Sequence, residues 1–278
     1  ALTGGEPFVR KDIVDIVKLF IKNNNPKRIH IASNGFITDK IEEQVLGMLK
    51  IIGNSRLTLQ FSIDGFEDLH DELRGVKGSF DRVCETVKRL GQIEDKRLAV
   101  SVATVVMKKN FNQIRDLKKF VNNELGVSMK FNVLRKLDHV KGVKKEDLMD
   151  LEIRDANFEV PTEDQLNELV KIVDDGTISS LIEKKKIEVS IDVLKGKKRV
   201  NCLAGLRDAV IFPNGDVSIC EPIKAIANLN DYDFNFSQMW NSSSVKEKRS
   251  KLVGKCFCMN SCNLMNALQF DTDVLINL

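Results

Sequence analysis

The sequence predicts an α/β fold with a parallel sheet, followed by a small α+β extension rich in cysteine. Helical stripes alternate with short β-branched segments over roughly the first 135 residues. Five of the six cysteines lie in the last third of the chain. Strand–helix–strand repeats form right-handed crossovers, so their strands run parallel. A closed or partly closed β/α barrel and an open doubly wound sheet both fit this alternation.

The elements of the first part follow from apolar spacing and from residues typical of helix ends. Lys11 to Lys22 carries a broad apolar stripe and predicts a helix. Thr38 and Ser79 are expected to be the N-caps of helices that end near Ile52 and Leu90. Another helix starts at Asn110 or Asn112 and ends near Asn123. The β-branched runs predict a stub at Leu2-Thr3 and strands at Arg28 to Ala32, Leu57 to Ile63, Leu98 to Val106 and Met129 to Leu134.

The second part begins with two expected helices, Thr162 to Asp174 and Ile178 to Lys186. A domain boundary is expected near Lys195, which gives domains 1–194 and 195–278. The Asn-Gly turn at residues 214–215 predicts a hairpin between the segments 208–212 and 216–220. A single helix is expected from Phe236 to Val253.

Composition limits the partners. The net charge of +3 is too small to favour nucleic acid or a membrane surface as the main partner. No apolar run approaches the roughly 20 residues of a membrane span. Clustered cysteines fit metal ligation in a reducing cytoplasm better than a disulfide framework. We therefore expect a cytoplasmic protein without a nucleic-acid or membrane partner.

Small polar residues recur where three successive strands end. These segments are Gly4-Gly5-Glu6, Ser33-Asn34-Gly35 and Ser62-Ile63-Asp64-Gly65. Each one alone is explained by a turn. Three at the same edge of one sheet favour a ligand site, because parallel strands bring their carboxyl ends together.

These segments resemble the radical S-adenosylmethionine (SAM) superfamily, and the stretch from Phe61 to Gly75 is the most specific match. The resemblance implies a partial (β/α)6 TIM-like barrel that lacks its first strand. It also implies SAM as a cofactor. Ser62 would contact the SAM ribose, Arg74 the carboxylate, and Leu134 would support the adenine. The remaining cofactor-binding residues that it implies are Gly4, Gly5 and Glu6, near the methionine amino group, with Asn34 and Asp64.

The clustered cysteines follow a recognisable spacing. Twelve residues separate Cys202 from Gly215, four more precede Cys220, and Cys256, Cys258 and Cys262 follow. This resembles the SPASM/Twitch extension of radical SAM enzymes and implies an auxiliary [4Fe–4S] cluster. Five cysteines suffice for one four-thiolate cluster with one left over, and the spacing does not say which. A structural zinc site is the alternative, although zinc sites usually use close cysteine pairs.

The superfamily motif of three cysteines that binds the catalytic cluster is not in this sequence, which opens on Ala1. We expect it upstream, so the chain as given would be an inactive fragment. The resemblance implies a radical SAM enzyme in which a 5′-deoxyadenosyl radical abstracts hydrogen from a substrate. A peptide is favoured over a small molecule, with an electron donor such as flavodoxin or ferredoxin. No catalytic acid or base can be assigned. The alternatives are a non-catalytic iron–sulfur scaffold, for electron transfer or peptide binding, and a zinc-stabilised binding module.

Overall fold

The computed structural model describes residues 1–149 and 158–270. The chain divides into two compact units, Ala1–Asn132 and Val133–Leu278. Each unit is built around its own secondary structure, and the two are described separately below.

A four-stranded sheet in the order β1-β2-β3-β4 forms the centre of the first unit. Its strands are β1 (Arg28–Ser33), β2 (Arg56–Ser62), β3 (Leu98–Val106) and β4 (Ser128–Val133). β1 pairs with β2, and β2 with β3, in parallel. Leu2 adds a parallel bridge to Ile31 at the β1 edge, and its N–H donates to the His30 carbonyl at 2.7 Å. The predicted strands and the stub are therefore confirmed.

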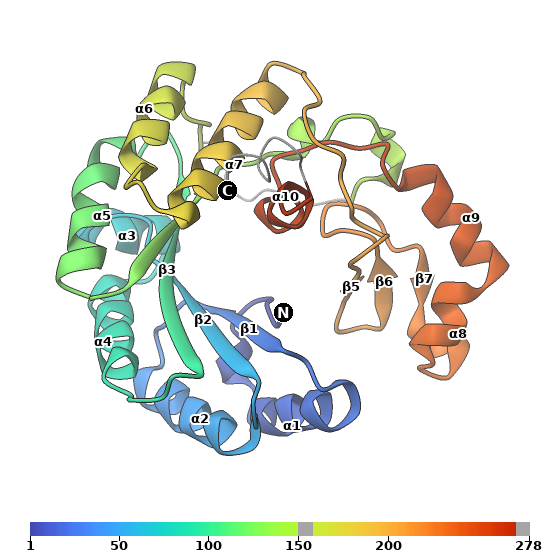
Figure 1. The fold of residues 1–278 in the computed structure, drawn as a ribbon, viewed down its shortest axis with the longest axis horizontal. Coiled ribbons are helices and arrows are strands. Elements are labelled where there is room, and N and C mark those ends of the chain that lie inside the picture. The colour runs from blue at the N-terminus through green and yellow to red at the C-terminus, as the bar shows by residue number, and fades with distance from the viewer. Residues whose placement is uncertain (150–157, 271–278) are drawn as a thin grey trace. The chain divides into compact units, whose positions relative to one another are not determined.

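Five helices accompany this sheet and lie along its outer side in Figure 1. They are α1 (Ile13–Asn24), α2 (Thr38–Ile51), α3 (Glu67–Arg74), α4 (Ser79–Gly91) and α5 (Ile114–Asn123). Short 3-10 turns, Pro7–Val9 and Phe111–Gln113, precede α1 and α5. Because each helix carries the chain back to start the next parallel strand, the carboxyl ends of the strands share one edge.

Two predicted helix caps were wrong, and both corrections have a side-chain cause. Thr38 lies inside α2, where its buried hydroxyl accepts a hydrogen bond from Thr86 at 2.8 Å. Gly78, not Ser79, is the N-cap of α4, with φ at +77°. The carboxylate of Asp71 caps this helix from a distance in the sequence, because it accepts from Phe80 N at 2.9 Å. The helix α3 was not predicted.

The second unit contains five α-helices and a three-stranded antiparallel sheet among its described residues. The strands β5 (Val210–Ile211), β6 (Asp216–Ser218) and β7 (Ala227–Asn228) pair in that order. The predicted hairpin is confirmed, and Gly215 takes the φ of +87° that its turn requires. The helices are α6 (Glu163–Val173), α7 (Ile178–Leu194), α8 (Phe236–Asn241), α9 (Ser243–Leu252) and α10 (Ser261–Leu268).

Two helices of this unit differ from the prediction. The expected helix from Phe236 to Val253 is two helices, because Ser242 adopts an extended ψ of 149° and caps α9 by accepting from Val245 N. The second helix, α7, continues to Leu194 and packs against α10. By compactness the chain divides before Val133. The domain boundary near Lys195 stays a prediction about where the cysteine-rich segment begins.

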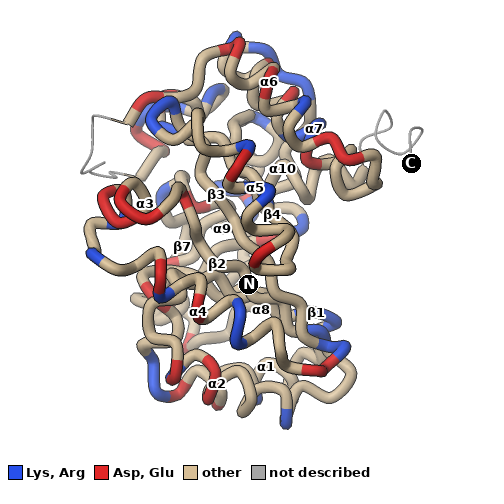
Figure 2. The backbone as a smooth tube through the Cα atoms, turned by 90° about the vertical axis from the view of Figure 1, so that its left-hand side faces the viewer, with Lys and Arg blue, Asp and Glu red and all other residues tan. Residues whose placement is uncertain are grey.

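Within residues 1–149 and 158–270, no helix combines the length and apolar character needed to cross a membrane. Basic and acidic residues are interspersed along the helices of the first unit (Figure 2). Some of these charges are paired with a nearby opposite charge, such as Arg89 with Asp39 at 2.7 Å.

Candidate functional site

Glu6 ties the stub of the first unit to the end of β1. Its carboxylate accepts hydrogen bonds from Ser33 Oγ at 3.0 Å and from Asn34 N at 2.7 Å. It also caps the turn that follows, because Phe8 N donates to it at 3.1 Å. Ser33 Oγ also lies 3.0 Å from the second carboxylate oxygen, so each oxygen of Glu6 has two donors near it. The predicted residues Glu6 and Asn34 are thus brought together, at the carboxyl end of the strands.

The two glycines before Glu6 leave the backbone uncovered. Gly4 has a φ of +123°, a conformation that L residues rarely adopt. A Cβ atom built on Gly4 or Gly5 would meet no atom within 4 Å. Open space beside a bare backbone allows a ligand to approach these peptide groups closely. These positions therefore fit a ligand-binding role better than a packing role.

The guanidinium of Arg74 is held by a buried carboxylate. Arg74 Nη2 lies 2.5 Å from Asp64 Oδ2, and the Asp64 side chain is 7% exposed. Asp64 is itself fixed because Val105 N donates to its Oδ1 at 2.8 Å. Arg74 Nε is buried and has no hydrogen-bond partner among the described residues. A buried, unsatisfied donor on a fixed cation is a place where an anionic ligand gains binding energy.

Two further residues, neither of them predicted to bind the cofactor, hold the loop after β2. His70 is buried, and burial, followed by the nearby Arg74 charge, lowers its pKa to about 4. The neutral ring can therefore accept from Asp64 N, which lies 3.1 Å from Nδ1. Asn110, also fully buried, donates to the carbonyls of Asp64 and Val105 at 2.7 and 2.9 Å. Asn110 was expected only as a possible helix start.

The other predicted residues of this site lie at strand ends. Ser62 is the half-buried last residue of β2. Its neighbour Phe61 pairs in register with Ser33 of the adjacent strand β1. Leu134 follows β4 in the chain and belongs to the second unit by compactness. The roles of Ser62 and Leu134 stay predictions.

Four of the five extension cysteines interact with one another in the second unit. The interaction between the thiols of Cys202 and Cys256 lowers the pKa of Cys202 and raises that of Cys256. Burial raises the pKa of Cys220, and the charges of Cys258 and Cys202 raise it further. Burial also raises the pKa of Cys258. A negative charge on one of these sulfurs makes ionisation of its neighbours less favourable. Bound metal cations reverse this effect, because they stabilise the thiolate form.

Cys262 differs from these four. It is an exposed residue in the first turn of α10, and partial burial of its thiol, followed by the charge of Glu221, raises its pKa. Among the residues that the structure describes, no three His, Cys, Asp or Glu side chains lie close enough to hold a single metal ion. A cubane cluster places each thiolate on a different iron, so its ligands need not converge on one point as zinc ligands do.

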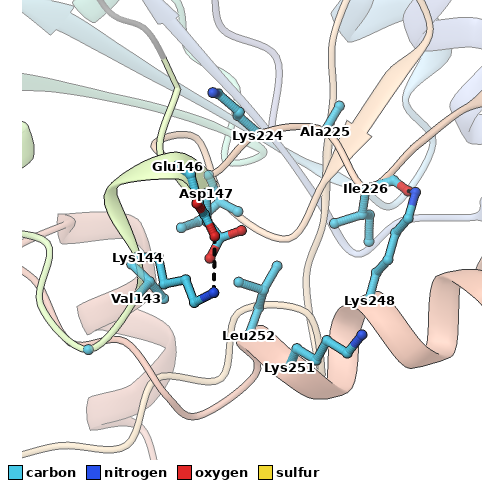
Figure 3. A pocket seen from close by; sticks show the side chains of 12 residues that line it. Val143, Lys144, Glu146, Asp147, Lys224, Ala225, Ile226, Lys248, Lys251 and Leu252 are labelled. Atoms are coloured by element: carbon cyan, nitrogen blue, oxygen red, sulfur yellow. Dashed lines mark hydrogen bonds and ion pairs between the residues drawn. The ribbon is translucent and has the colours of Figure 1, made fainter.

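A separate pocket of about 610 Å³ lies in the second unit (Figure 3). It opens between the segment around Lys144, the loop around Lys224 and the helix α9. Lysines and acidic residues share its rim: Lys144 pairs with Glu146 at 3.0 Å, and Lys248 donates to the Ile226 carbonyl at 2.9 Å. None of the predicted site residues lines this pocket.

Comparison with known proteins identifies the class of protein. Residues 1–121 match the family described as the Radical SAM superfamily. This segment contains Glu6, Asn34, Asp64 and Arg74, the residues whose contacts are described above. The chain is therefore similar to the radical SAM superfamily over its residues 1–121. This similarity implies a [4Fe–4S] cluster and SAM as cofactors.

Curated relatives extend the similarity beyond this segment. The antilisterial bacteriocin subtilosin biosynthesis protein AlbA of Bacillus subtilis is 26% identical over 88% of this chain and 49% of its own length. The sporulation killing factor maturation protein SkfB of the same organism is 29% identical over 42% of this chain and 26% of its own length. A GTP 3′,8-cyclase of Clostridium perfringens is 25% identical over 89% of this chain and 70% of its own length. The chain spans about half the length of AlbA and about a quarter of that of SkfB.

Proposed function

We propose that this protein is a radical SAM enzyme that binds SAM at the carboxyl edge of the β1–β4 sheet. The observation that carries the proposal is the buried, unsatisfied Nε of Arg74, on a guanidinium fixed by Asp64. Arg74 and Asp64 both lie within residues 1–121, the segment that matches the superfamily. We further propose the partial (β/α)6 barrel for this part of the chain, on the strength of its parallel sheet.

The chain's own residues would bind and orient the cofactor. Arg74 offers donors to the SAM carboxylate, and Glu6 offers its negative charge to the amino group. The bare backbone at Gly4 and Gly5 leaves room for the methionine moiety, and Ser62 would bind the ribose. When bound, the cluster and SAM would supply one-electron chemistry for hydrogen abstraction. The protein contributes orientation of the reacting groups.

This proposal is tested by SAM binding, measured by isothermal titration calorimetry. Glu6→Gln removes a charge that faces the amino group, so we expect SAM affinity to fall about tenfold, the range of one charged hydrogen bond. Lys40→Gln is the control, because its ammonium donates to the Val9 carbonyl instead. Unchanged affinity in Glu6→Gln would contradict this assignment.

We also propose that Cys202, Cys220, Cys256 and Cys258 hold an auxiliary [4Fe–4S] cluster in a SPASM/Twitch-like extension, and that Cys262 is the cysteine left over. The mutual influence of the four thiols supports this set. The exposure of Cys262 supports its exclusion. The match to AlbA supports the extension, since it covers 88% of the chain.

Iron and sulfide analysis after anaerobic reconstitution tests the ligand set. Cys220→Ala should lose most of the iron and the brown absorbance of the extension, because a cubane needs its thiolates. Cys262→Ala is the matched control and should retain both. Loss of iron in Cys262→Ala together with retention in Cys256→Ala or Cys258→Ala would contradict the proposed set. Zinc bound in place of iron would favour the zinc-stabilised module.

A peptide is the substrate that the named relatives favour. AlbA and SkfB are named for the biosynthesis of a bacteriocin and the maturation of a killing factor, and bacteriocins are antibacterial peptides. A nucleoside triphosphate is the second candidate, because a GTP 3′,8-cyclase matches 89% of the chain. Equilibrium dialysis with GTP separates the two: we expect no binding at micromolar GTP. Saturable GTP binding would contradict the peptide assignment.

A further inference from the structure

Two buried asparagines direct their amide groups at the cysteine sulfurs of the second unit. Asn263 Nδ2 donates to Cys220 Sγ at 2.9 Å, and Asn260 N donates to Cys258 Sγ at 3.4 Å. Asn260 Nδ2 also lies 3.8 Å from Cys220 Sγ. The two side chains are among the polar groups that the extension buries, since Asn260 is 3% exposed and Asn263 8%.

A buried amide is costly unless its hydrogen bonds are made, so the partner of Asn263 indicates its purpose. A neutral thiol is a weak acceptor, and a thiolate is a much better one. The hydrogen bond from the Asn263 amide to Cys220 is therefore strongest when that sulfur carries negative charge. Cluster ligation gives the sulfur this charge.

The neighbouring asparagine is held in place from two sides. Asn260 Oδ1 accepts from Cys262 N at 3.2 Å and so caps α10. Its Nδ2 lies 3.4 Å from Glu221 Oε2, which also accepts from Arg135 at 2.6 Å. The chain Arg135–Glu221–Asn260 fixes the start of α10, the helix that carries Asn263 one turn along.

We propose that Asn263 is a positioning residue that raises the reduction potential of the auxiliary cluster, an inference that rests on the proposed function. An N–H donor on a ligand sulfur withdraws electron density from it. The reduced cluster carries one more negative charge than the oxidised cluster, so the hydrogen bond stabilises the reduced form more. Removing the donor should therefore make the cluster harder to reduce.

The test is a redox titration of the reconstituted protein, followed by electron paramagnetic resonance, after iron has been counted in each sample. Asn263→Leu removes the donor at similar size, and we expect a lower midpoint potential with iron content retained. Asn266→Leu is the matched control. It changes an asparagine on the same helix whose Nδ2 donates to Asp208 at 2.7 Å and to no sulfur. Its midpoint potential should match that of the wild-type protein.

Each outcome decides between the two claims. An unchanged potential in an iron-replete Asn263→Leu protein overturns the role of Asn263 and leaves the cluster intact. Failure of the wild-type protein to hold iron overturns the proposed cluster itself. If Asn263→Leu loses its iron, Asn263→Asp serves instead, because it keeps the shape and replaces the donor with a negative acceptor. Its potential should again lie below that of the wild-type protein, and an equal or higher value overturns the role.

Discussion

Arg74 shows how a single side chain is prepared for a ligand. Its charge is neutralised in part by Asp64, which lies deeper in the unit and is held by a backbone N–H. The ion pair fixes the plane of the guanidinium and leaves Nε buried without a partner. A lysine at this position would not offer the planar set of donors that the guanidinium provides. Asp64 thus acts through Arg74, a role that its position in the sequence alone did not reveal.

Asp64→Asn tests this dependence. The amide keeps the size of the side chain but removes the charge that holds a 30%-exposed arginine. We expect the free energy of unfolding to fall by about 2 kcal/mol, less than the loss of a fully buried ion pair. Urea denaturation measures this, with Asp68→Asn on the exposed side of α3 as the control. Equal stability of the two variants would show that the pair contributes nothing to folding.

The junction between α3 and α4 depends on one carboxylate that both helices share. Asp71, in α3, accepts hydrogen bonds from Gly78 N, Ser79 Oγ and Phe80 N at the start of α4. These N–H groups have no partner within their own helix. The chain can therefore turn sharply through Gly75 and Gly78, both at positive φ, without losing backbone hydrogen bonds.

Asp71→Ala should lower the free energy of unfolding by about 1 to 2 kcal/mol, the usual cost of removing a helix cap. Asp71→Asn keeps an acceptor oxygen and should cost less. Thermal unfolding of the two variants at equal protein concentration compares them. A loss in Asp71→Asn as large as that in Asp71→Ala would show that charge, and not the cap geometry, is what matters.

The sequence predicted elements well where the signal was local. The β-branched runs placed β1 to β4 within a residue or two, because alternation and turn residues are read along a few positions. Caps and breaks were missed where the partner lies far along the chain. Thr38 bonds to Thr86, and α4 is capped by Asp71. The break at Ser242 was also missed, although its cap is local, since Ser242 accepts from Val245 N.

Residues of the candidate site could likewise be predicted where the signal was local and not where the partners lie far apart in the sequence. Residues at strand ends, such as Glu6 and Asn34, could be proposed because a parallel sheet gathers its strand ends at one edge. Arg74, at the end of α3, was proposed only from the resemblance to the superfamily. The contact of Asn263 with Cys220 joins residues 43 positions apart, and no local pattern marks it. The sequence likewise could not separate Cys262 from the other cysteines, since their spacing alone treats all five alike.

The chain combines two compact units with distinct chemistry in this account. The first carries the superfamily match and the proposed SAM-binding edge, and the second carries the proposed cluster. Neither proposal depends on how the two units are arranged, so each can be tested by binding and metal analysis on its own residues. Only the activity of the whole enzyme depends on both proposals.

Reductive cleavage of SAM tests the central claim most directly. Protein expressed from its complete gene, reconstituted without oxygen and reduced with dithionite, is incubated with SAM, and 5′-deoxyadenosine is measured by liquid chromatography. The account predicts that 5′-deoxyadenosine forms, and that Arg74→Ala lowers its rate at subsaturating SAM while iron content is unchanged. Iron-replete wild-type protein that forms no 5′-deoxyadenosine would contradict a radical SAM enzyme.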